Sequence, residues 1–167
     1  QLTDHYNPAN RTVNLSPEVY EGRNISAAAV AAHECGHAVQ HATAYAWLTM
    51  RSKMVPVVSF SGKIMNMVFL FSILGMSVLG LGFEQALVVV IAAQAVVATF
   101  AVVTLPVEYD ASRRALVWLQ GAGITDASNH HQAEDALKWA ARTYLVAAAA
   151  AVTQLVYYIM LYMGRRD

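Results

Sequence analysis

The sequence predicts a mainly α-helical protein that spans a membrane several times and carries a small β-hairpin at its N-terminus. Its 167 residues are 57% hydrophobic and only 13% charged, which is about half the charged fraction of a typical soluble domain. Three stretches lack charged residues and approach the ~20 apolar residues that a ~30 Å hydrocarbon layer requires. They are residues 64–82, 86–105 and 144–163. We therefore expect residues 1–167 to form a single membrane domain in contact with a lipid bilayer.

Residues 1–16 have the pattern of a short β-hairpin. Two strand-like runs flank the turn-forming sequence Asn-Pro-Ala-Asn at residues 7–10. The second run is a candidate edge strand to which an extended peptide could add as a further strand. Its residues are Thr12, Val13, Asn14 and Leu15. The alternative is an ordinary hairpin strand without a binding role.

The remaining segments predict helices. An alanine-rich helix is expected at residues 26–50, and Pro56 should interrupt the chain before the first span because proline disrupts a helix interior. Residues 106–142 predict juxtamembrane helices with a glycine-containing break at residues 121–123. The helix after this break continues into the third span without a clear stop signal.

The first two spans are separated only by residues 83–85, so the segments on either side of this pair should lie on the same side of the membrane. All 11 Lys and Arg residues except Arg165 and Arg166 fall on that side. Positively charged segments favour the cytoplasmic side, so the shared side is expected to face the cytoplasm. The two exceptions leave the orientation of the third span open. The net charge of zero gives no indication of a nucleic-acid partner.

His33, Glu34 and His37 match the pattern H-E-x-x-H within the predicted helix 26–50. Residues four apart lie on one face of a helix, so both imidazoles can reach one metal ion, while Glu34 is rotated by about 100°. Zinc suits such a site because it holds and polarises the attacking water. Glu34 can then accept a proton from that water. The pattern predicts one zinc ion and hydrolytic chemistry.

A catalytic zinc site of this kind needs a third protein ligand. Glu108 follows the second span closely, and the expected fold-back of the first two spans would bring it to the histidines. A carboxylate near a helix start that interacts with the helix dipole is the alternative. The other candidates are Asp110, His41, His130, His131 and His5.

Four segments resemble the bacterial membrane neutral zinc metallopeptidase family (YugP-like), and the resemblance covers essentially the whole chain. They are residues 2–8, 30–41, 105–116 and 140–148. The family is similar, more distantly, to the HtpX-type and CaaX prenyl proteases. The resemblance implies a zincin-like juxtamembrane catalytic region of the gluzincin type, with Glu108 as the third ligand. It also implies a multi-pass protein of the bacterial cytoplasmic membrane that hydrolyses protein or peptide substrates at the cytoplasmic surface.

Two departures from these families affect the expectations. The HtpX-type motif has an aspartate four residues after the ligand glutamate, as a partner for a histidine, and this sequence has Ser112 there. Either Ser112 or Asp110 should take that role. Family members also carry a further apolar N-terminal segment, and this chain begins at Gln1. We therefore expect a natural N-terminal portion to precede it.

Other polar residues predict weaker roles near the site. His41 lies one turn after His37 and could support a ligand, contact substrate or form only a local hydrogen bond. His5 or Tyr6, which only the family resemblance singles out, could stabilise the transition state, since some group must do so. An intramembrane zinc protease and a non-proteolytic zinc-containing membrane scaffold are the alternative functions. The natural substrate and the oligomeric state are left open by the sequence.

Overall fold

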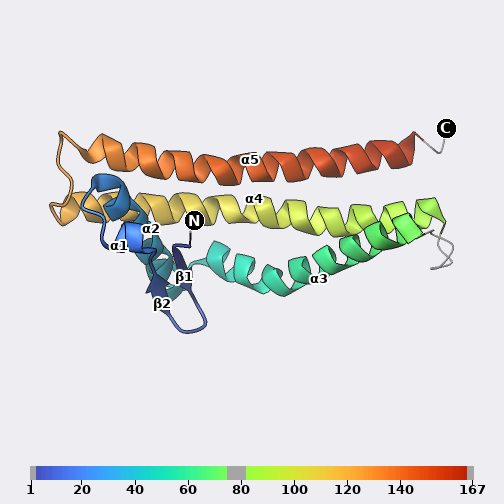
Figure 1. Cartoon of the computed structure of the whole chain (residues 1–167), viewed down its shortest axis with the longest axis horizontal. Coiled ribbons are helices and arrows are strands. Elements are labelled where there is room, and N and C mark those ends of the chain that lie inside the picture. Colours follow the sequence, from blue (N-terminus) through green and yellow to red (C-terminus); the bar gives the residue numbers. More distant parts are fainter. Residues whose placement is uncertain (1–2, 75–81, 165–167) are drawn as a thin grey trace. The chain divides into compact units, whose positions relative to one another are not determined.

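The computed structural model describes residues 3–74 and 82–164, and these residues form a mainly helical protein (Figure 1). The order of elements is β1 (His5–Asn7), β2 (Thr12–Asn14), α1 (Pro17–Tyr20), α2 (Ile25–Ala42), α3 (Ala46–Leu74), α4 (Phe83–Gly121) and α5 (His130–Met163). The chain divides into two compact units. Unit 1 comprises Gln1–Thr49 and Thr104–Leu145, and unit 2 comprises Met50–Val103 and Val146–Asp167.

The predicted hairpin is present in unit 1. β1 and β2 pair in antiparallel register, with Tyr6 opposite Val13 and His5 opposite Asn14. Asp4 fixes the exit of the hairpin, because its Oδ1 accepts a hydrogen bond of 2.7 Å from the backbone N–H of Ser16. Leu15 lies just beyond the end of β2, so the candidate edge strand is shorter than predicted.

Helix α2 packs against α4 and α5 within unit 1. Its start is capped by Asn24, whose side chain accepts a hydrogen bond of 2.8 Å from the N–H of Ala27. Alanines of α2 and one alanine and one leucine from each of the other two helices form one buried cluster. Its members are Ala29, Ala32, Ala115, Leu119, Ala133 and Leu137. This packing holds α2 against the part of α4 that carries Glu108.

The closest approach of α2 to α4 occurs at Gly36. A Cβ atom built on this glycine would lie 2.7 Å from the carbonyl oxygen of Ala111. Any larger side chain would therefore force the two helices apart. Gly36 lies between His33 and His37, so the glycine is what allows the histidine-bearing turn of α2 to reach α4.

The prediction of one helix over residues 26–50 is wrong at its C-terminal end. α2 ends at Ala42, and Ala44 follows in a left-handed conformation with φ of 51°. The N–H of Ala44 bonds to the carbonyl of His41, and the N–H of Tyr45 bonds to that of Gln40. This is the Schellman pattern of helix termination. α3 then begins at Ala46.

The bounds of the predicted spans also differ from the structure. α3 extends over Ala46–Leu74 with Pro56 inside it, so this proline does not interrupt the chain before the first span. The last part of the predicted span 64–82 falls on residues 75–81, which lie outside the described residues. Phe83, Glu84 and Gln85, expected as a connecting turn, form the start of α4. Pro106 lies inside α4, so no separate juxtamembrane helix begins at residue 106.

Among the described residues, three helices are long and apolar enough to cross a membrane: Ala46–Phe71, Phe83–Gly121 and His130–Met163. In unit 2, a polar contact joins two of them. Gln94 is buried, and its Nε2 donates a hydrogen bond of 3.0 Å to the carbonyl of Ala151. In a lipid-facing bundle such a bond satisfies an otherwise costly polar group. Gln154 instead donates to Tyr158 on its own helix.

Candidate metal centre

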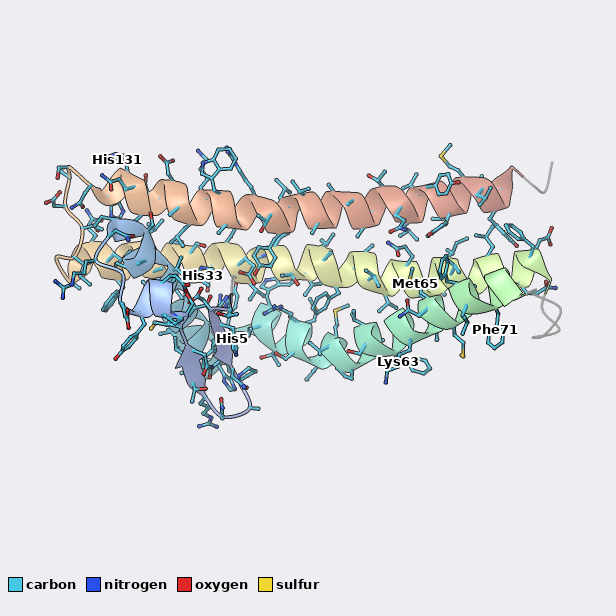
Figure 2. The ribbon with its side chains drawn as sticks, in the orientation of Figure 1. His5, His33, Lys63, Met65, Phe71 and His131 are labelled. Carbon is cyan, nitrogen blue, oxygen red and sulfur yellow. The ribbon has the colours of Figure 1, made fainter. Side chains whose placement is uncertain are left out.

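His33, His37 and Glu108 converge in unit 1. Their ligand atoms all lie within 4.8 Å of one another. The Nε2 atoms of His33 and His37 lie 3.2 Å and 3.6 Å from Oε2 of Glu108, whose side chain is only 2% exposed. Figure 2 shows His33 on α2, with the hairpin that carries His5 beside this helix. The two histidines of the H-E-x-x-H pattern and the distant carboxylate thus form one largely buried group of metal-ligand type.

Each imidazole is oriented by a partner on its other nitrogen. Nδ1 of His33 lies 3.1 Å from Oγ of Ser112, and Nδ1 of His37 lies 3.0 Å from Oε1 of Gln40. Both Nε2 atoms therefore face Glu108. A partner on the second nitrogen is the usual way in which proteins fix a metal-binding histidine. Of the two candidates for this role, Ser112 contacts His33 directly, whereas Asp110 does not.

Gln40 is a site residue that the sequence analysis did not identify. Its Nε2 donates to the carbonyl of Val107 (2.8 Å) and to Oδ2 of Asp110 (2.9 Å), while its Oε1 faces His37. Both amide hydrogens and the carbonyl oxygen thus have partners, so the orientation of this fully buried amide is unambiguous. Gln40 is the link by which Asp110 reaches His37.

Asp110 is the anchor of this network. Arg113 and Arg114, three and four residues later on α4, each place a guanidinium nitrogen 2.6 Å from one of its carboxylate oxygens. The Asp110 side chain is 6% exposed, whereas Arg113 is 75% exposed. The two arginines neutralise a carboxylate that is otherwise removed from water, which keeps it as an acceptor for Gln40.

Glu34 lies on the same turn of α2 as the two histidines. The residue is buried at 9% exposure. Its carboxylate forms no hydrogen bond or ion pair with any residue that the structure describes. A carboxylate without protein partners beside a ligand cluster is available to accept a proton.

The pKa values of His37 and Cys35, both on α2, are raised for different reasons. Burial alone would lower the pKa of His37, but hydrogen bonding to Glu108 and its negative charge outweigh this effect, and the pKa is raised above its ordinary value. Desolvation and the charge of Glu34 raise the pKa of the Cys35 thiol. Because a cysteine nucleophile needs a lowered pKa, Cys35 does not have the properties of one.

The remaining candidate residues lie apart from the three ligand atoms. The hydroxyl of Tyr6 is 2.6 Å from Nδ1 of His41, one turn beyond His37. Nδ1 of His5 is 2.7 Å from the carbonyl of Thr3, so His5 bonds within its own segment. His130 contacts Thr125, and His131 is an exposed residue at the start of α5 (Figure 2). None of these four histidines belongs to the group of possible metal ligands among the described residues.

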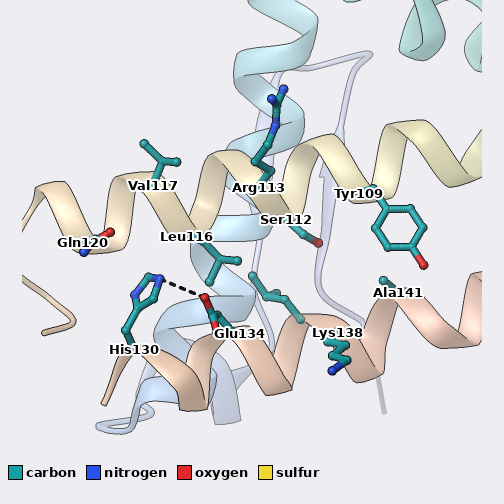
Figure 3. Close-up of a pocket in the computed structure, with 11 residues that line it drawn as sticks. Tyr109, Ser112, Arg113, Leu116, Val117, Gln120, His130, Glu134, Lys138 and Ala141 are labelled. Atoms are coloured by element: carbon teal, nitrogen blue, oxygen red, sulfur yellow. Dashed lines mark ion pairs between the residues drawn. The ribbon is translucent and has the colours of Figure 1, made fainter. Parts of the chain in front are cut away.

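A mainly apolar groove of about 520 Å³ runs between α4 and α5 in unit 1 (Figure 3). Ser112 contributes to its wall, so the groove reaches the residue that orients His33. At one end His130 and Glu134 face each other, with Nε2 and Oε1 3.8 Å apart. The other lining residues are Tyr109, Arg113, Leu116, Val117, Gln120, Leu137, Lys138 and Ala141.

Membrane-length helices and a buried set of two imidazoles and a carboxylate define the class of protein: a helical membrane protein with a candidate site for a divalent metal ion. Residues 1–163 match the sequence model of a family described as "Putative neutral zinc metallopeptidase", and the chain belongs to this family. It is also 38% identical over 168 aligned positions to the "Putative membrane protease YugP" of Bacillus subtilis (strain 168), covering 99% of this chain and 71% of that protein. No solved structure matches the chain significantly.

Proposed function

We propose that the chain is a membrane-bound zinc endopeptidase of the gluzincin type, in which His33, His37 and Glu108 hold one zinc ion and Glu34 is the general base. The observation that carries this proposal is the convergence of three ligand atoms from two helices within 4.8 Å. The family match supports zinc as the metal.

The donor geometry fits a zinc ion. Tetrahedral zinc with bonds of about 2.0–2.2 Å separates neighbouring ligand atoms by roughly 3.3–3.5 Å. The two imidazole nitrogens lie 3.2 Å and 3.6 Å from the nearer Glu108 oxygen, close to these separations, and all the ligand atoms lie within 4.8 Å of one another. Three protein ligands leave the fourth position open, which distinguishes catalytic from structural zinc sites.

When bound, zinc would supply a Lewis acid that polarises a peptide carbonyl and lowers the pKa of water at the open position toward about 7. Glu34 then takes the proton from the attacking water and delivers it to the leaving amine. Ser112 and Gln40 keep both rings in position throughout. The Tyr6 hydroxyl and His41 are placed one helical turn away, where they can contact substrate.

An extended segment of a protein or peptide is the proposed substrate. β2 is paired only with β1 among the described strands, so the other edge of Thr12, Val13 and Asn14 has no strand partner there and is the proposed place for a peptide strand. Such strand addition supplies backbone hydrogen bonds that do not depend on substrate sequence. It therefore suits an endopeptidase acting within a chain.

We place the protein in the bacterial cytoplasmic membrane with this site on the cytoplasmic side. The excess of Lys and Arg around the apolar stretches supports the orientation, although Arg51, Lys53 and Lys63 lie within α3 rather than before it. Cys35 is exposed and next to Glu34, and it is the single cysteine of the sequence. A membrane-impermeant maleimide should label Cys35 in inside-out vesicles and not in intact cells; the reverse pattern would contradict the orientation.

The catalytic proposal is tested by digestion of a broad peptide library with the purified chain in lipid nanodiscs. The unmodified chain should cleave peptides, and a zinc chelator should stop the cleavage. Glu34→Gln should lose cleavage while it retains zinc. Chelator-resistant cleavage, or full activity of Glu34→Gln, would remove the mechanism.

The alternative functions are less well supported. An intramembrane protease requires its metal-binding helix within the bilayer, and α2 is not among the described helices that are apolar enough to span one. A zinc-containing scaffold has no use for a carboxylate at Glu34 that forms no hydrogen bond or ion pair within the described residues, and structural zinc sites normally fill the fourth position with protein.

A further inference from the structure

We propose that a hollow beside the ligand cluster binds a carboxylate of the substrate, either an acidic side chain or the C-terminal carboxylate. The hollow is lined by Tyr6, Arg11, Ala38, His41 and Ala42. This inference rests on the proposed peptidase function and adds a specificity-determining residue, Arg11, to it.

The position of the hollow makes it a neighbour of the reacting groups. Ala38 follows the ligand His37 directly, and His41 lies one turn further along α2, which corresponds to about 6 Å along the helix axis. The volume is about 360 Å³, at the lower end of the range for small-ligand sites. It therefore has room for one side chain or one chain end of a peptide bound at the ligand cluster.

The pair of Tyr6 and His41 prepares a hydrogen-bond donor at this hollow. The Tyr6 hydroxyl and Nδ1 of His41 form a hydrogen bond of 2.6 Å. If Tyr6 donates, the neutral imidazole keeps its proton on Nε2; if His41 donates, the Tyr6 O–H is free to donate. In either tautomer the pair retains one N–H or O–H donor without an acceptor among the described residues. Tyr6 comes from β1 and His41 from α2, so their bond also fixes the hairpin to the helix on which the ligands lie.

Arg11 adds a positive charge that has no partner within the described part of the chain. It lies in the hairpin turn with φ of 58°, in the left-handed region that glycine or asparagine occupies more easily. The turn itself gives no reason for an arginine at this position, and strained residues of this kind gather at binding sites. Within the part of the chain that the structure describes, no acidic side chain lines the hollow.

A carboxylate is the ligand that matches these donors. The planar guanidinium of Arg11 can bind both oxygens of a carboxylate, and such charge-assisted bonds are stronger than neutral ones. The Tyr6–His41 pair offers a further donor. The methyl groups of Ala38 and Ala42 leave space for a carboxylate. They carry no acceptor that would compete with it for the donors.

The test uses two matched probes, N-acetyl-aspartate amide and N-acetyl-asparagine amide, which differ only in charge and in one donor group. Binding to the full chain in nanodiscs is followed by the NMR signals of ¹⁵N-labelled histidine, with His41→Gln used to assign the His41 signal. The aspartate probe should shift that signal and the asparagine probe should not. Arg11→Ala should weaken binding of the aspartate probe about tenfold, and Arg11→Lys should weaken it less.

The control variant is Arg23→Ala, which removes an exposed arginine outside the hollow and should leave binding unchanged. Arg11→Glu should abolish binding of the aspartate probe. If aspartate and asparagine probes bind equally, or if Arg11→Ala binds aspartate as well as the parent chain, the proposal is overturned.

Peptides in the Glu34→Gln background distinguish the two sources of carboxylate. One peptide carries an internal aspartate and an amidated C-terminus, and the other carries asparagine and a free C-terminus. If binding of one peptide depends on Arg11, the result supports the site and shows whether it takes a side-chain or a C-terminal carboxylate. If both peptides bind without dependence on Arg11, the proposal is overturned. Failure of the parent chain to cleave any peptide, with Arg11-dependent binding of the aspartate probe retained, would instead remove the peptidase function and leave the carboxylate site in place.

Discussion

At the scale of single residues, a contact at Nδ1 of each imidazole fixes the orientation of the ring. The Nε2 atom of each ring therefore faces the ligand cluster. Ser112 and Gln40 hold the two Nδ1 atoms, and Asp110 with its two arginines holds Gln40. The metal affinity of the site should therefore depend on residues that never touch the ion.

Gln40→Ala tests this dependence. Loss of the amide frees the His37 ring to rotate and removes the link between this ring and Asp110, so zinc affinity should fall about 10- to 100-fold. Competition with a fluorescent chelator measures the change. Gln132→Ala removes an exposed glutamine on α5 and should have no effect; an equal effect of the two substitutions would show that Gln40 does not support the ligand.

The pH dependence of zinc binding follows from His37. Its pKa in the metal-free chain is raised above the ordinary 6.5, because Glu108, Gln40 and Glu34 together favour the imidazolium more than burial opposes it. A raised pKa keeps this ring protonated up to a higher pH, and zinc requires the neutral ring. Zinc affinity should therefore begin to fall above pH 6.5 as the solution is acidified. Affinity that stays constant down to pH 5 would contradict the assignment of His37 as a ligand.

The sequence predicts part of this site, for reasons that residue types explain. The spacing of His33, Glu34 and His37 is enough to predict that the two histidines converge, because an α-helix places positions i and i+4 on one face. The role of Glu108 came from family resemblance and a fold-back argument. Gln40 was missed because its function depends on the carbonyl of Val107 and on Asp110, which only the packing of α2 against α4 brings near.

At the scale of secondary-structure elements, the contact of α2 with α4 decides whether the ligands meet. Gly36→Ala places a Cβ at 2.7 Å from the Ala111 carbonyl. The helices must separate, so the substitution should destabilise the protein by about 1–3 kcal/mol and reduce its zinc content. Thermal unfolding and metal analysis measure both effects.

Gly121→Ala is the matched control, because a Cβ there meets nothing within 4 Å. It should leave stability unchanged or slightly increased, since alanine is the better helix former. If Gly36→Ala is as stable and as rich in zinc as Gly121→Ala, the close approach of the two helices is not required.

Helix ends show which boundaries a sequence can predict. α4 ends with Gly123 in the left-handed position (φ 68°), and the break at residues 121–123 was predicted. α2 ends with the same hydrogen-bond pattern but has Ala44 in that position, so the sequence contains no glycine signal. The predicted helix therefore ran on to residue 50.

Ala44→Gly should stabilise the chain by about 1 kcal/mol, because glycine avoids the steric cost of a left-handed alanine. Gly123→Ala introduces the same cost at the equivalent position of α4 and should destabilise by a similar amount. Thermal unfolding of both variants measures the pair. If both substitutions changed the unfolding temperature in the same direction, the left-handed residue would not determine the stability of these helix ends.

At the scale of the whole molecule, hydropathy predicts the fold class but not the bounds of the helices. The three apolar stretches mark lengths suited to lipid, and the structure contains three helices of that kind among the described residues. Each helix extends past its apolar stretch because polar residues can continue a helix. Two prolines also lie inside helices, Pro56 in α3 and Pro106 in α4, as membrane helices tolerate. Hydropathy alone therefore predicts a turn between the first two spans at residues 83–85, whereas these residues form the start of α4.

The central claim is that one zinc ion is held by a carboxylate distant in sequence together with two histidines. The most direct measurement is the zinc content per purified chain, determined by mass spectrometry for Glu108→Gln beside Glu34→Gln. Glu34→Gln should retain about one zinc per chain, because this glutamate is not a ligand. Glu108→Gln should lose most of it. Equal zinc content in the two variants would contradict the account.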